Sequence, residues 1–510
     1  MLHLAAGAAL LVAAWLVPRH IAQARFVSLP AVLLDASPVA LGAALLGVAA
    51  GRPLFAGVIM LAAGAGFALA DYTMRQTLHE PVVFSEMSEL PQVFTHPQLY
   101  LPFAGPGLVI GGAIGAALLA IALLLVEPPL WTPHFVAGLF ATALVAVTGW
   151  LVARQPLLGA TAHGLRRLRP SGEPYADAAA LGPFAMLIAQ TVIARDERRA
   201  RQVALAAPAF IARRGNDGVP VIIVQCESFF DARRLSPQIP RDFLPGFEAC
   251  CASAVQYGHV EVPGWGANTM RAEFAVVSGI AESELGYDRF NPYYALARVP
   301  LDSQVWRMRR GGYRTLCLHP FDARFFRRDV VMPALGFERF LDRRVLGGSS
   351  TPPYAPDPDL ASHILHTLDA EGPCSLIFAI TMGNHGPWLP QGPALDPTVT
   401  ALFDPAGMPG GAELLRYLDG LRRSDAMLRL LMAGLEERKS PAILAFYGDH
   451  LPSLPNAFAH FGFTEPHSDY VIWRANQEAG MTRRHDLQAH QLGRAVVDLV
   501  LDPAANAPRP

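Results

Sequence analysis

The sequence predicts an N-terminal bundle of membrane-spanning helices followed by an α/β domain with a mostly parallel central sheet. Two patterns predict this. Long apolar runs with at most one charged residue are concentrated in the first third of the 510 residues, and after residue 218 short apolar runs alternate with helical patterns. Strands that alternate with helices are typical of a parallel sheet covered on both faces. The formal net charge of −2 gives no sign of a nucleic-acid-binding surface.

Five apolar runs are candidate membrane spans, because a span needs about 20 mostly apolar residues. The last two meet this length without a charged residue, whereas the second contains Asp35 and Pro38. The first is also short enough for a signal peptide, but we favour a span because no basic residue precedes it. Their many small residues would let helices pack closely in lipid. The runs cover residues 2–17, 31–50, 54–70, 107–126 and 134–153.

The stretch 155–217 is Arg-rich and broken by Pro and Gly, with apolar spacing suited to helices on a membrane surface. Within it, TVIARDERRARQ (191–202) predicts an exposed connecting helix. We therefore expect a transmembrane domain at 1–154, a connecting, partly interfacial helical segment at 155–217 and an α/β domain at 218–505.

Arginines beside the spans bear on orientation, because basic residues in short loops favour the cytoplasmic side. Two follow the first run and four follow the last, which by itself would place the C-terminal half in the cytoplasm. They are Arg19, Arg25, Arg154, Arg166, Arg167 and Arg169.

Four predicted strands end in residues that bind metals or transfer protons. In parallel sheets ligands bind beyond the carboxyl ends of the strands, so these residues should converge on one edge. Taken singly, an acid here can cap a helix and a histidine can be a turn residue, but repetition at four strand ends favours a site. Acids with histidine suit Mn²⁺, Zn²⁺ or Mg²⁺, and sequence does not choose between them. The segments 219–229, 313–329, 374–388 and 441–455 carry Glu227, His319, Asn384 with His385, and Asp449 with His450.

The stretch VPGWGANTMRAEF (262–274) places Thr269 at the start of a predicted helix, 269–280. A hydroxyl is a weak nucleophile that needs a base or a metal to activate it. A helix N-terminus also attracts phosphate. The structural alternative is that Thr269 is an N-cap, with Glu273 in the first turn. Both interpretations are compatible, since a helix start suits a nucleophile that faces an anion.

These segments resemble lipoteichoic-acid-synthase-type phosphoglycerol transferases of the alkaline phosphatase/sulfatase superfamily. The resemblance spans nearly the whole chain, and the motifs ESF, NTMRAEF, HPFDARFFRRD, MGNHGPW and YGDH occur in the family order. It implies one divalent metal, usually Mn²⁺, bound by Glu227, Thr269, Asp449 and His450, with Thr269 as the nucleophile. It further implies a glycerophosphate pocket lined by His319, Phe326, Arg328 and His385.

The resemblance implies a multi-pass cytoplasmic-membrane protein whose catalytic domain lies outside the cytoplasm, against the arginine count. Its reaction would move glycerophosphate from phosphatidylglycerol to a hydroxyl of a cell-envelope glycan or polymer. We expect His385 to protonate the leaving oxygen and Arg328 to hold phosphate oxygens through its planar fork. Two residues depart from the family pattern. Phe326 stands where Trp is frequent, and Arg271 stands where many relatives carry an acid, so Arg271 could pair with a phosphate or with Glu273.

Three alternatives remain. A sulfatase needs Cys or Ser, then Pro two residues on and Arg two further, where this chain has Arg271 and Glu273 after Thr269. A phosphoethanolamine transferase has a similar metal site but usually several disulfides, and the five cysteines here are scattered. A transporter or sensor gains slight support from Asp35 in an apolar run.

Overall fold

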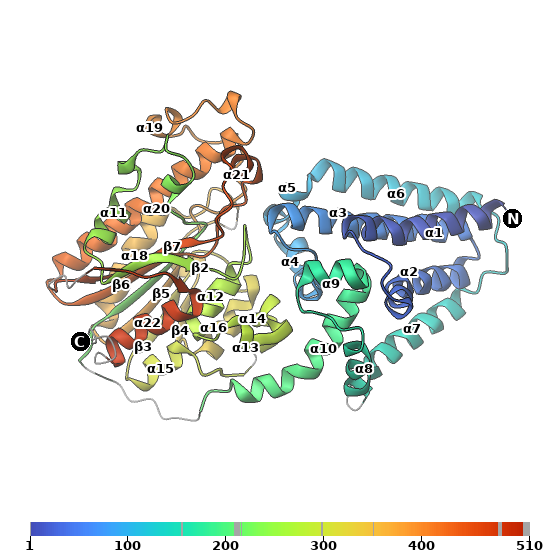
Figure 1. The fold of residues 1–510 in the computed structure, drawn as a ribbon, viewed down its shortest axis with the longest axis horizontal. Helices are drawn as coiled ribbons and strands as arrows, with labels where there is room; N and C mark the ends of the chain where they lie inside the picture. The colour runs from blue at the N-terminus through green and yellow to red at the C-terminus, as the bar shows by residue number, and fades with distance from the viewer. Residues whose placement is uncertain are drawn as a thin grey trace. The chain divides into compact units, whose positions relative to one another are not determined.

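The computed structural model describes residues 2–152, 154, 157–208, 215, 217–296, 299–349, 351–477 and 482–502. Its contacts divide the chain into two compact units, Met1–Arg199 and Ala200–Pro510. The first unit is helical, and the second holds every strand found in the described residues (Figure 1). The three-part division expected from sequence stays a prediction, and its end at residue 505 lies outside the described residues.

Four helices of the first unit are long and apolar enough to cross a membrane: α1 (Leu2–Ile21), α2 (Leu29–Ala50), α3 (Pro53–Thr77) and α6 (Pro106–Val126). The fifth predicted span is also helical, as α7 (Phe135–Val152), but its apolar stretch Phe135–Leu151 is shorter. Four predicted spans therefore meet the requirement in the described part of the chain, and the fifth stays a prediction. The helices α8 (Leu157–Arg166), α9 (Pro174–Leu181) and α10 (Pro183–Ala204) follow.

Small residues bring α1 and α3 together, as the composition of these runs predicts. A methyl group added at Gly7 would lie 2.6 Å from the carbonyl oxygen of Pro53, and one at Gly64 would overlap the carbonyl of Ala14. Such close backbone approach is typical of helices that associate in lipid. By contrast, α6 buries only Ala120 against protein, so most of its apolar surface is available to lipid.

Asp35, the charge inside the second predicted span, is completely buried and paired. Its Oδ2 accepts hydrogen bonds from Arg19 Nη1 and Trp15 Nε1, both at 2.7 Å. Its Oδ1 accepts the backbone amides of Phe184 at 2.9 Å and Ala185 at 3.2 Å, at the start of α10. The carboxylate thus caps α10 and ties it to α1 and α2. This structural role removes the support that Asp35 gave to the transporter alternative.

The second unit is built on a nine-stranded sheet in the order β4-β3-β5-β1-β6-β7-β2-β8, with β9 beside β2. The pairs from β4 to β6 are parallel, while β7 is antiparallel to β6 and β2. The prediction of a mostly parallel central sheet is therefore confirmed. The strands are β1 (Val221–Cys226), β2 (Gln256–Glu261), β3 (Arg314–Leu318), β4 (Arg339–Leu341), β5 (Ser375–Ile380), β6 (Ala442–Gly448), β7 (Ser468–Ala475), β8 (Arg483–Arg484) and β9 (Leu487–Gln488).

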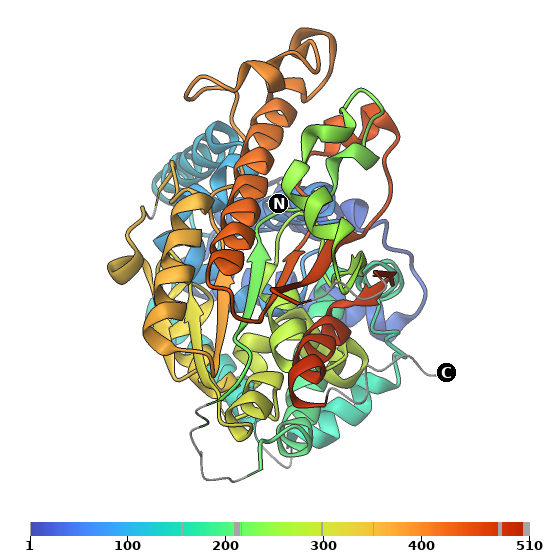
Figure 2. The same cartoon turned by 90° about the vertical axis from the view of Figure 1, so that its left-hand side faces the viewer.

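Helices cover both faces of this sheet (Figures 1 and 2). Alternate residues of β1 point to opposite faces, so Ile222 and Val224 join one core cluster and Val221 and Ile223 join the other. The first cluster packs under α11 (Pro245–Ala252), α18 (Asp357–Glu371) and α20 (Gly411–Glu437), and the second under α12 (Thr269–Ser278), α15 (Gln304–Arg310) and α22 (Ala489–Leu501).

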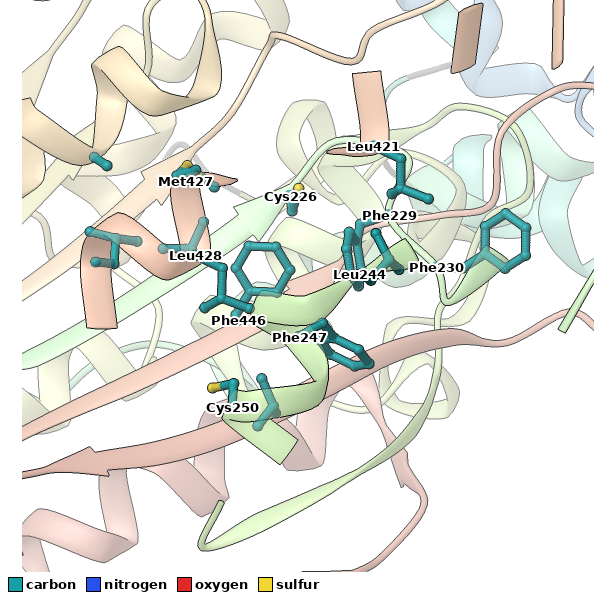
Figure 3. Packing of buried hydrophobic residues seen from close by; sticks show 14 of the residues in the cluster. Cys226, Phe229, Phe230, Leu244, Phe247, Cys250, Leu421, Met427, Leu428 and Phe446 are labelled. Carbon is teal, nitrogen blue, oxygen red and sulfur yellow. The ribbon is translucent and has the colours of Figure 1, made fainter. Parts of the chain in front are cut away.

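Aromatic side chains fill the first cluster next to the end of β1. The Phe229 ring lies 5.2 Å from that of Phe247 and 4.8 Å from that of Phe446, centroid to centroid and edge to face (Figure 3). Such pairs add to the stabilisation that burial alone provides. These aromatic contacts therefore hold the turn that follows β1 in place.

The Asp35 cluster generates a stability prediction. Replacing Asp35 by Ala leaves Arg19 buried without its counter-charge, which should lower the free energy of unfolding by about 3–5 kcal/mol. Thermal unfolding of the full-length protein in detergent measures this. The double variant Arg19→Met/Asp35→Leu, which removes both charges, should lose less. A single variant as stable as the native protein would show that the cluster carries little energy.

Candidate functional site

The candidate site lies at the carboxyl ends of four adjacent strands, in the order β3, β5, β1 and β6. The first side chain after β1 is Glu227, and Asp449 and His450 follow β6 directly. Their ligand atoms all lie within 4.8 Å of one another, and all three side chains are buried. The expectation that residues from these strand ends meet at one edge holds for this trio.

The register of the sheet places the two acids side by side. Cys226, the last residue of β1, pairs with Gly448, the last residue of β6, so Glu227 and Asp449 occupy equivalent positions on neighbouring parallel strands. A methyl group at Gly448 would overlap the carbonyl of Phe229. Glycine is therefore the residue that allows β6 to end this close to the turn after β1.

Ser228 fixes both carboxylates. Its backbone φ of 55° lies in the left-handed region, and its amide donates to Asp449 Oδ1 at 2.8 Å. Its hydroxyl donates to Glu227 Oε1, also at 2.8 Å. The Glu227 amide donates to Thr381 Oγ1 at 2.9 Å, and the Tyr417 hydroxyl donates to the Ser228 carbonyl at 2.8 Å. The strained turn is thus held from three sides, which is typical of a functional constraint.

The protonation chemistry of this trio fits a divalent cation. Burial and then the charge of Glu227 raise the pKa of Asp449 to about 7. Burial acts to lower the pKa of His450, but the charges of Asp449 and Glu227 outweigh it and raise this pKa. His450 Nδ1 faces the Leu451 carbonyl at 3.0 Å, which leaves Nε2 towards Glu227 and Asp449 at 3.4 and 3.5 Å.

Asp449 Oδ2 is a second sign that a cation belongs here. This oxygen is buried and has no hydrogen-bond partner among the described residues. A buried carboxylate oxygen without a hydrogen bond is costly, and His450 Nε2, 3.5 Å from this oxygen, makes only a long contact with it. A bound cation would satisfy the oxygen and relieve the repulsion between the two acids. Carboxylates with an imidazole suit Mn²⁺, Zn²⁺ or Mg²⁺, and which of these the site holds stays a prediction.

Thr269 is the first residue of α12, is 8% exposed, and has its Oγ1 3.4 Å from His450 Nε2. The N-cap position belongs to Asn268, whose φ is 65°, so the alternative that Thr269 is itself the cap is wrong. The hydroxyl therefore lies beside the acid–histidine trio, at a helix N-terminus that favours anions.

A buried ion pair between Arg328 and Glu273 lies next to His319, the first residue after β3. Arg328 is 1% exposed, and its Nη2 and Nε contact Glu273 Oε2 and Oε1 at 2.8 and 3.0 Å. Tyr293 also donates to Glu273. The remaining guanidinium nitrogen, Nη1, lies 3.4 Å from His319 Nε2. His319 Nδ1 faces the Ile380 carbonyl at 3.1 Å, and burial with the charge of Arg328 holds the pKa of His319 well below its ordinary value.

These contacts bear on two expectations from sequence: that Arg328 holds phosphate oxygens, and that Arg271 could pair with a phosphate or with Glu273. We expected the planar guanidinium of Arg328 to bind phosphate oxygens, but its Nε and Nη2 donate hydrogen bonds to Glu273. Arg271 donates from Nε to the Phe290 carbonyl at 3.0 Å, and its guanidinium lies over the Phe290 ring. Phe326 is half-buried, with the Arg328 guanidinium 5.3 Å from its ring centroid. The binding roles of all three side chains stay predictions.

Tyr354 is a site residue that sequence reasoning missed. Its ring meets that of His385 edge to face at a centroid distance of 5.7 Å. Asn384 precedes His385, and its side-chain amide nitrogen is buried without a hydrogen-bond partner among the described residues. Its Oδ1 accepts a hydrogen bond from Trp388 Nε1 at 3.1 Å. Tyr354 lies outside every motif, and its segment has no strand or helix periodicity to mark it.

A sequence model of the sulfatase family matches residues 221–500, which is more than half of the chain and includes the whole site. The chain belongs to the sulfatase family. This confirms the membership of the alkaline phosphatase/sulfatase superfamily that the motifs predicted.

The sulfatase-family chain is similar to several known proteins. It is 30% identical over 438 residues to the capsular polysaccharide biosynthesis protein RkpI of Rhizobium meliloti, covering 82% of this chain and 77% of RkpI. The Streptococcus pyogenes phosphoglycerol transferase GacH in complex with sn-glycerol-1-phosphate matches with a TM-score of 0.43 and 21% identity, over 61% of this chain and 80% of that chain. The phosphoethanolamine transferase EptA from Neisseria meningitidis matches with a TM-score of 0.49 and 13% identity, over 88% of each chain.

The pKa of Asp449 generates a pH prediction for the metal-free protein. Between about pH 4 and pH 7 the folded carboxyl keeps a proton that the unfolded chain has lost. The contribution of Asp449 to the free energy of unfolding should therefore fall as pH rises through this window and stay constant above it. Urea unfolding of the full-length protein with a chelator present measures the slope, and Asp449→Asn should flatten it.

Mn²⁺ provides the complementary measurement. At about 100 times its dissociation constant a cation that binds only the folded state adds about 2.7 kcal/mol, and Asp449→Asn should abolish most of this gain. Native protein whose unfolding does not respond to Mn²⁺, Zn²⁺ or Mg²⁺ would contradict the metal assignment.

Proposed function

We propose that this protein is a membrane-bound transferase that moves glycerophosphate from phosphatidylglycerol to a hydroxyl of a cell-envelope glycan or polymer. The observation that carries the proposal is the position of Thr269 Oγ1, at a helix N-terminus and 3.4 Å from His450 Nε2 in the buried acid–histidine trio. Helices long and apolar enough to cross a membrane precede the site in the chain, which suits a lipid donor.

Glu227, Thr269, Asp449 and His450 would hold one divalent metal ion, Mn²⁺ by the resemblance to phosphoglycerol transferases. When bound, such an ion lowers the pKa of a hydroxyl and neutralises charge on a phosphoryl group.

The chain's own residues carry the transfer in two steps. In the first, Thr269 Oγ loses its proton to solvent and forms a bond to phosphorus, the bond from phosphorus to the diacylglycerol oxygen breaks, and His385 protonates that leaving oxygen. In the second, the acceptor oxygen bonds to phosphorus while its proton passes to His385, the bond from phosphorus to Thr269 Oγ breaks, and that oxygen takes a proton back from solvent. The N-terminal amides of α12 favour the anionic phosphoryl group throughout.

Arg328 takes a different role here from the one expected. With Nε and Nη2 bound to Glu273, it presents Nη1 to His319 and keeps that imidazole neutral with its Nε2 facing the guanidinium. We propose that Arg328 positions His319 in the glycerophosphate pocket, and that Phe326 forms part of the pocket wall. Arg271 is assigned to acceptor choice, on its departure from the family pattern.

The acceptor class is inferred from a relative that is 30% identical to this chain over 438 residues. RkpI is a capsular polysaccharide biosynthesis protein, which supports a glycan hydroxyl as acceptor. A lipid donor and an envelope glycan meet outside the cytoplasm, so we assign the site to that side of the membrane. The arginines near the spans favour the other orientation, and a reporter fused to the C-terminus distinguishes the two.

Phosphoethanolamine transfer is the competing activity. All five cysteines are unpaired in the structure, which argues against the disulfide-bonded domain usual in those enzymes. A sulfatase is disfavoured by Thr269, Arg271 and Glu273 at the positions of its nucleophile motif.

The nucleophile assignment is tested with purified full-length protein, Mn²⁺ and labelled phosphatidylglycerol. Thr269→Ala should reduce release of diacylglycerol by at least about 1,000-fold, because the covalent step loses its attacking atom. Thr269→Ser keeps a hydroxyl and should retain measurable activity. Release that survives in Thr269→Ala would refute the assignment.

The donor assignment is tested in parallel with labelled phosphatidylethanolamine. We expect diacylglycerol from phosphatidylglycerol alone. Transfer from phosphatidylethanolamine instead would replace the proposed activity with the competing one.

A further inference from the structure

The hydroxyl of Tyr354 is buried without a hydrogen-bond partner among the described residues, and the whole side chain is only 9% exposed. A buried hydroxyl left unpaired is costly, and native structures usually satisfy such groups. Each buried tyrosine hydroxyl described above has a partner: Tyr293 donates to Glu273, and Tyr417 donates to the Ser228 carbonyl. Tyr354 therefore calls for a functional explanation.

Gly348 and Asp357, which lie on either side of Tyr354 in the chain, contact residues that follow β3 and β5. Gly348, with φ of 111°, packs so closely that an added methyl group would lie 2.9 Å from the carbonyl oxygen of Pro320, the second residue after β3. Three residues beyond Tyr354, Asp357 Oδ1 accepts the Gly383 amide at 2.9 Å, just after β5. Asp357 Oδ2 accepts the Ser424 hydroxyl at 2.6 Å. Residues on both sides of Tyr354 thus contact the chain just beyond the carboxyl ends of β3 and β5.

The Tyr354 ring packs against His385 and against Phe321, the aromatic neighbour of His319. It meets His385 at 5.7 Å and Phe321 at 6.1 Å between ring centroids, edge to face in both cases. Phe321 in turn lies 6.0 Å from the ring of His319. Burial and then the negative charge of Glu227 raise the pKa of the Tyr354 hydroxyl. These contacts place Tyr354 in the wall of the site, next to the proposed proton donor.

We propose that the Tyr354 hydroxyl donates a hydrogen bond to an anionic oxygen of the phosphoryl group that is transferred. The inference rests on the proposed function and adds a substrate-binding residue to it. Phosphoryl oxygens accept strongly and have no proton to give, so they match a hydroxyl that lacks an acceptor. Burial raises the pKa of Tyr354 to about 12, which keeps the phenol protonated and suited to donate.

Tyr354→Phe isolates the hydroxyl, because the ring that packs against His385 and Phe321 remains. In full-length protein with Mn²⁺ and phosphatidylglycerol, kcat/KM should fall about 10- to 100-fold, the range for loss of one hydrogen bond to a charged group. The thermal midpoint should stay the same or rise, because no bond within the protein is lost. A tyrosine with a structural role would behave in the opposite way.

Tyr313→Phe is the matched control. This tyrosine is also buried, but its hydroxyl donates to the Val219 carbonyl at 3.1 Å and accepts the Val219 amide at 3.2 Å, at the start of β1 and remote from the strand ends of the site. Its removal should lower stability and leave kcat/KM unchanged. Activity lost equally in both variants would show that neither hydroxyl acts on substrate.

Two probes separate failure of this inference from failure of the proposed function. If native protein releases no diacylglycerol, the assignment of phosphatidylglycerol as donor is wrong. Cleavage of the chromogenic diester bis(p-nitrophenyl) phosphate then measures the activity of the phosphoryl site independently of the lipid. Binding of inorganic phosphate to Mn²⁺-loaded protein, measured by calorimetry, needs no turnover and should weaken about 10-fold in Tyr354→Phe. Tyr354→Phe that binds phosphate and cleaves the diester as the native protein does would overturn the proposal.

Discussion

The repulsion between two buried carboxylates is the constraint around which the site is built. Parallel pairing of β1 with β6 ends at Cys226 and Gly448, so Glu227 and Asp449 must emerge side by side. Glycine at 448 and the left-handed Ser228 permit this approach, and the Ser228 amide and hydroxyl hold one carboxylate each. An arrangement that concentrates negative charge in the protein interior is stable only with a compensating cation or a proton.

At the β3 end of the site, a buried carboxylate and a buried guanidinium, those of Glu273 and Arg328, balance each other's charge. Glu273 lies on α12, the helix that presents Thr269, and Arg328 begins α16 (Arg328–Leu335) after β3. The pair therefore joins the helix of the proposed nucleophile to the strand end that carries His319. The guanidinium is fully buried, its Nε and Nη2 contact Glu273, and its Nη1 faces His319.

Much of this could be predicted from sequence. Periodicity located β1, β3, β5 and β6, and the rule that ligands bind at strand ends brought Glu227, Asp449 and His450 together. The antiparallel β7 was not anticipated, because a buried strand reads alike in either direction. The partner of Arg328 could not be foreseen, since Arg271 lies closer to Glu273 in the chain while only the fold brings Arg328 to it. Tyr354 carries no periodic signal, and its role depends on a bridge through Asp357 and Gly383 that exists only in three dimensions.

The unpaired cysteines have a consequence for the cellular environment in which this protein works. Burial holds the pKa values of Cys226, Cys250 and Cys317 well above the ordinary value, so these groups stay as thiols and resist oxidation. The second unit is stabilised by two apolar clusters and a continuous sheet, with no covalent cross-link. None of the five cysteines is paired, so the fold forms without a disulfide bond and its maturation needs no thiol-oxidation step.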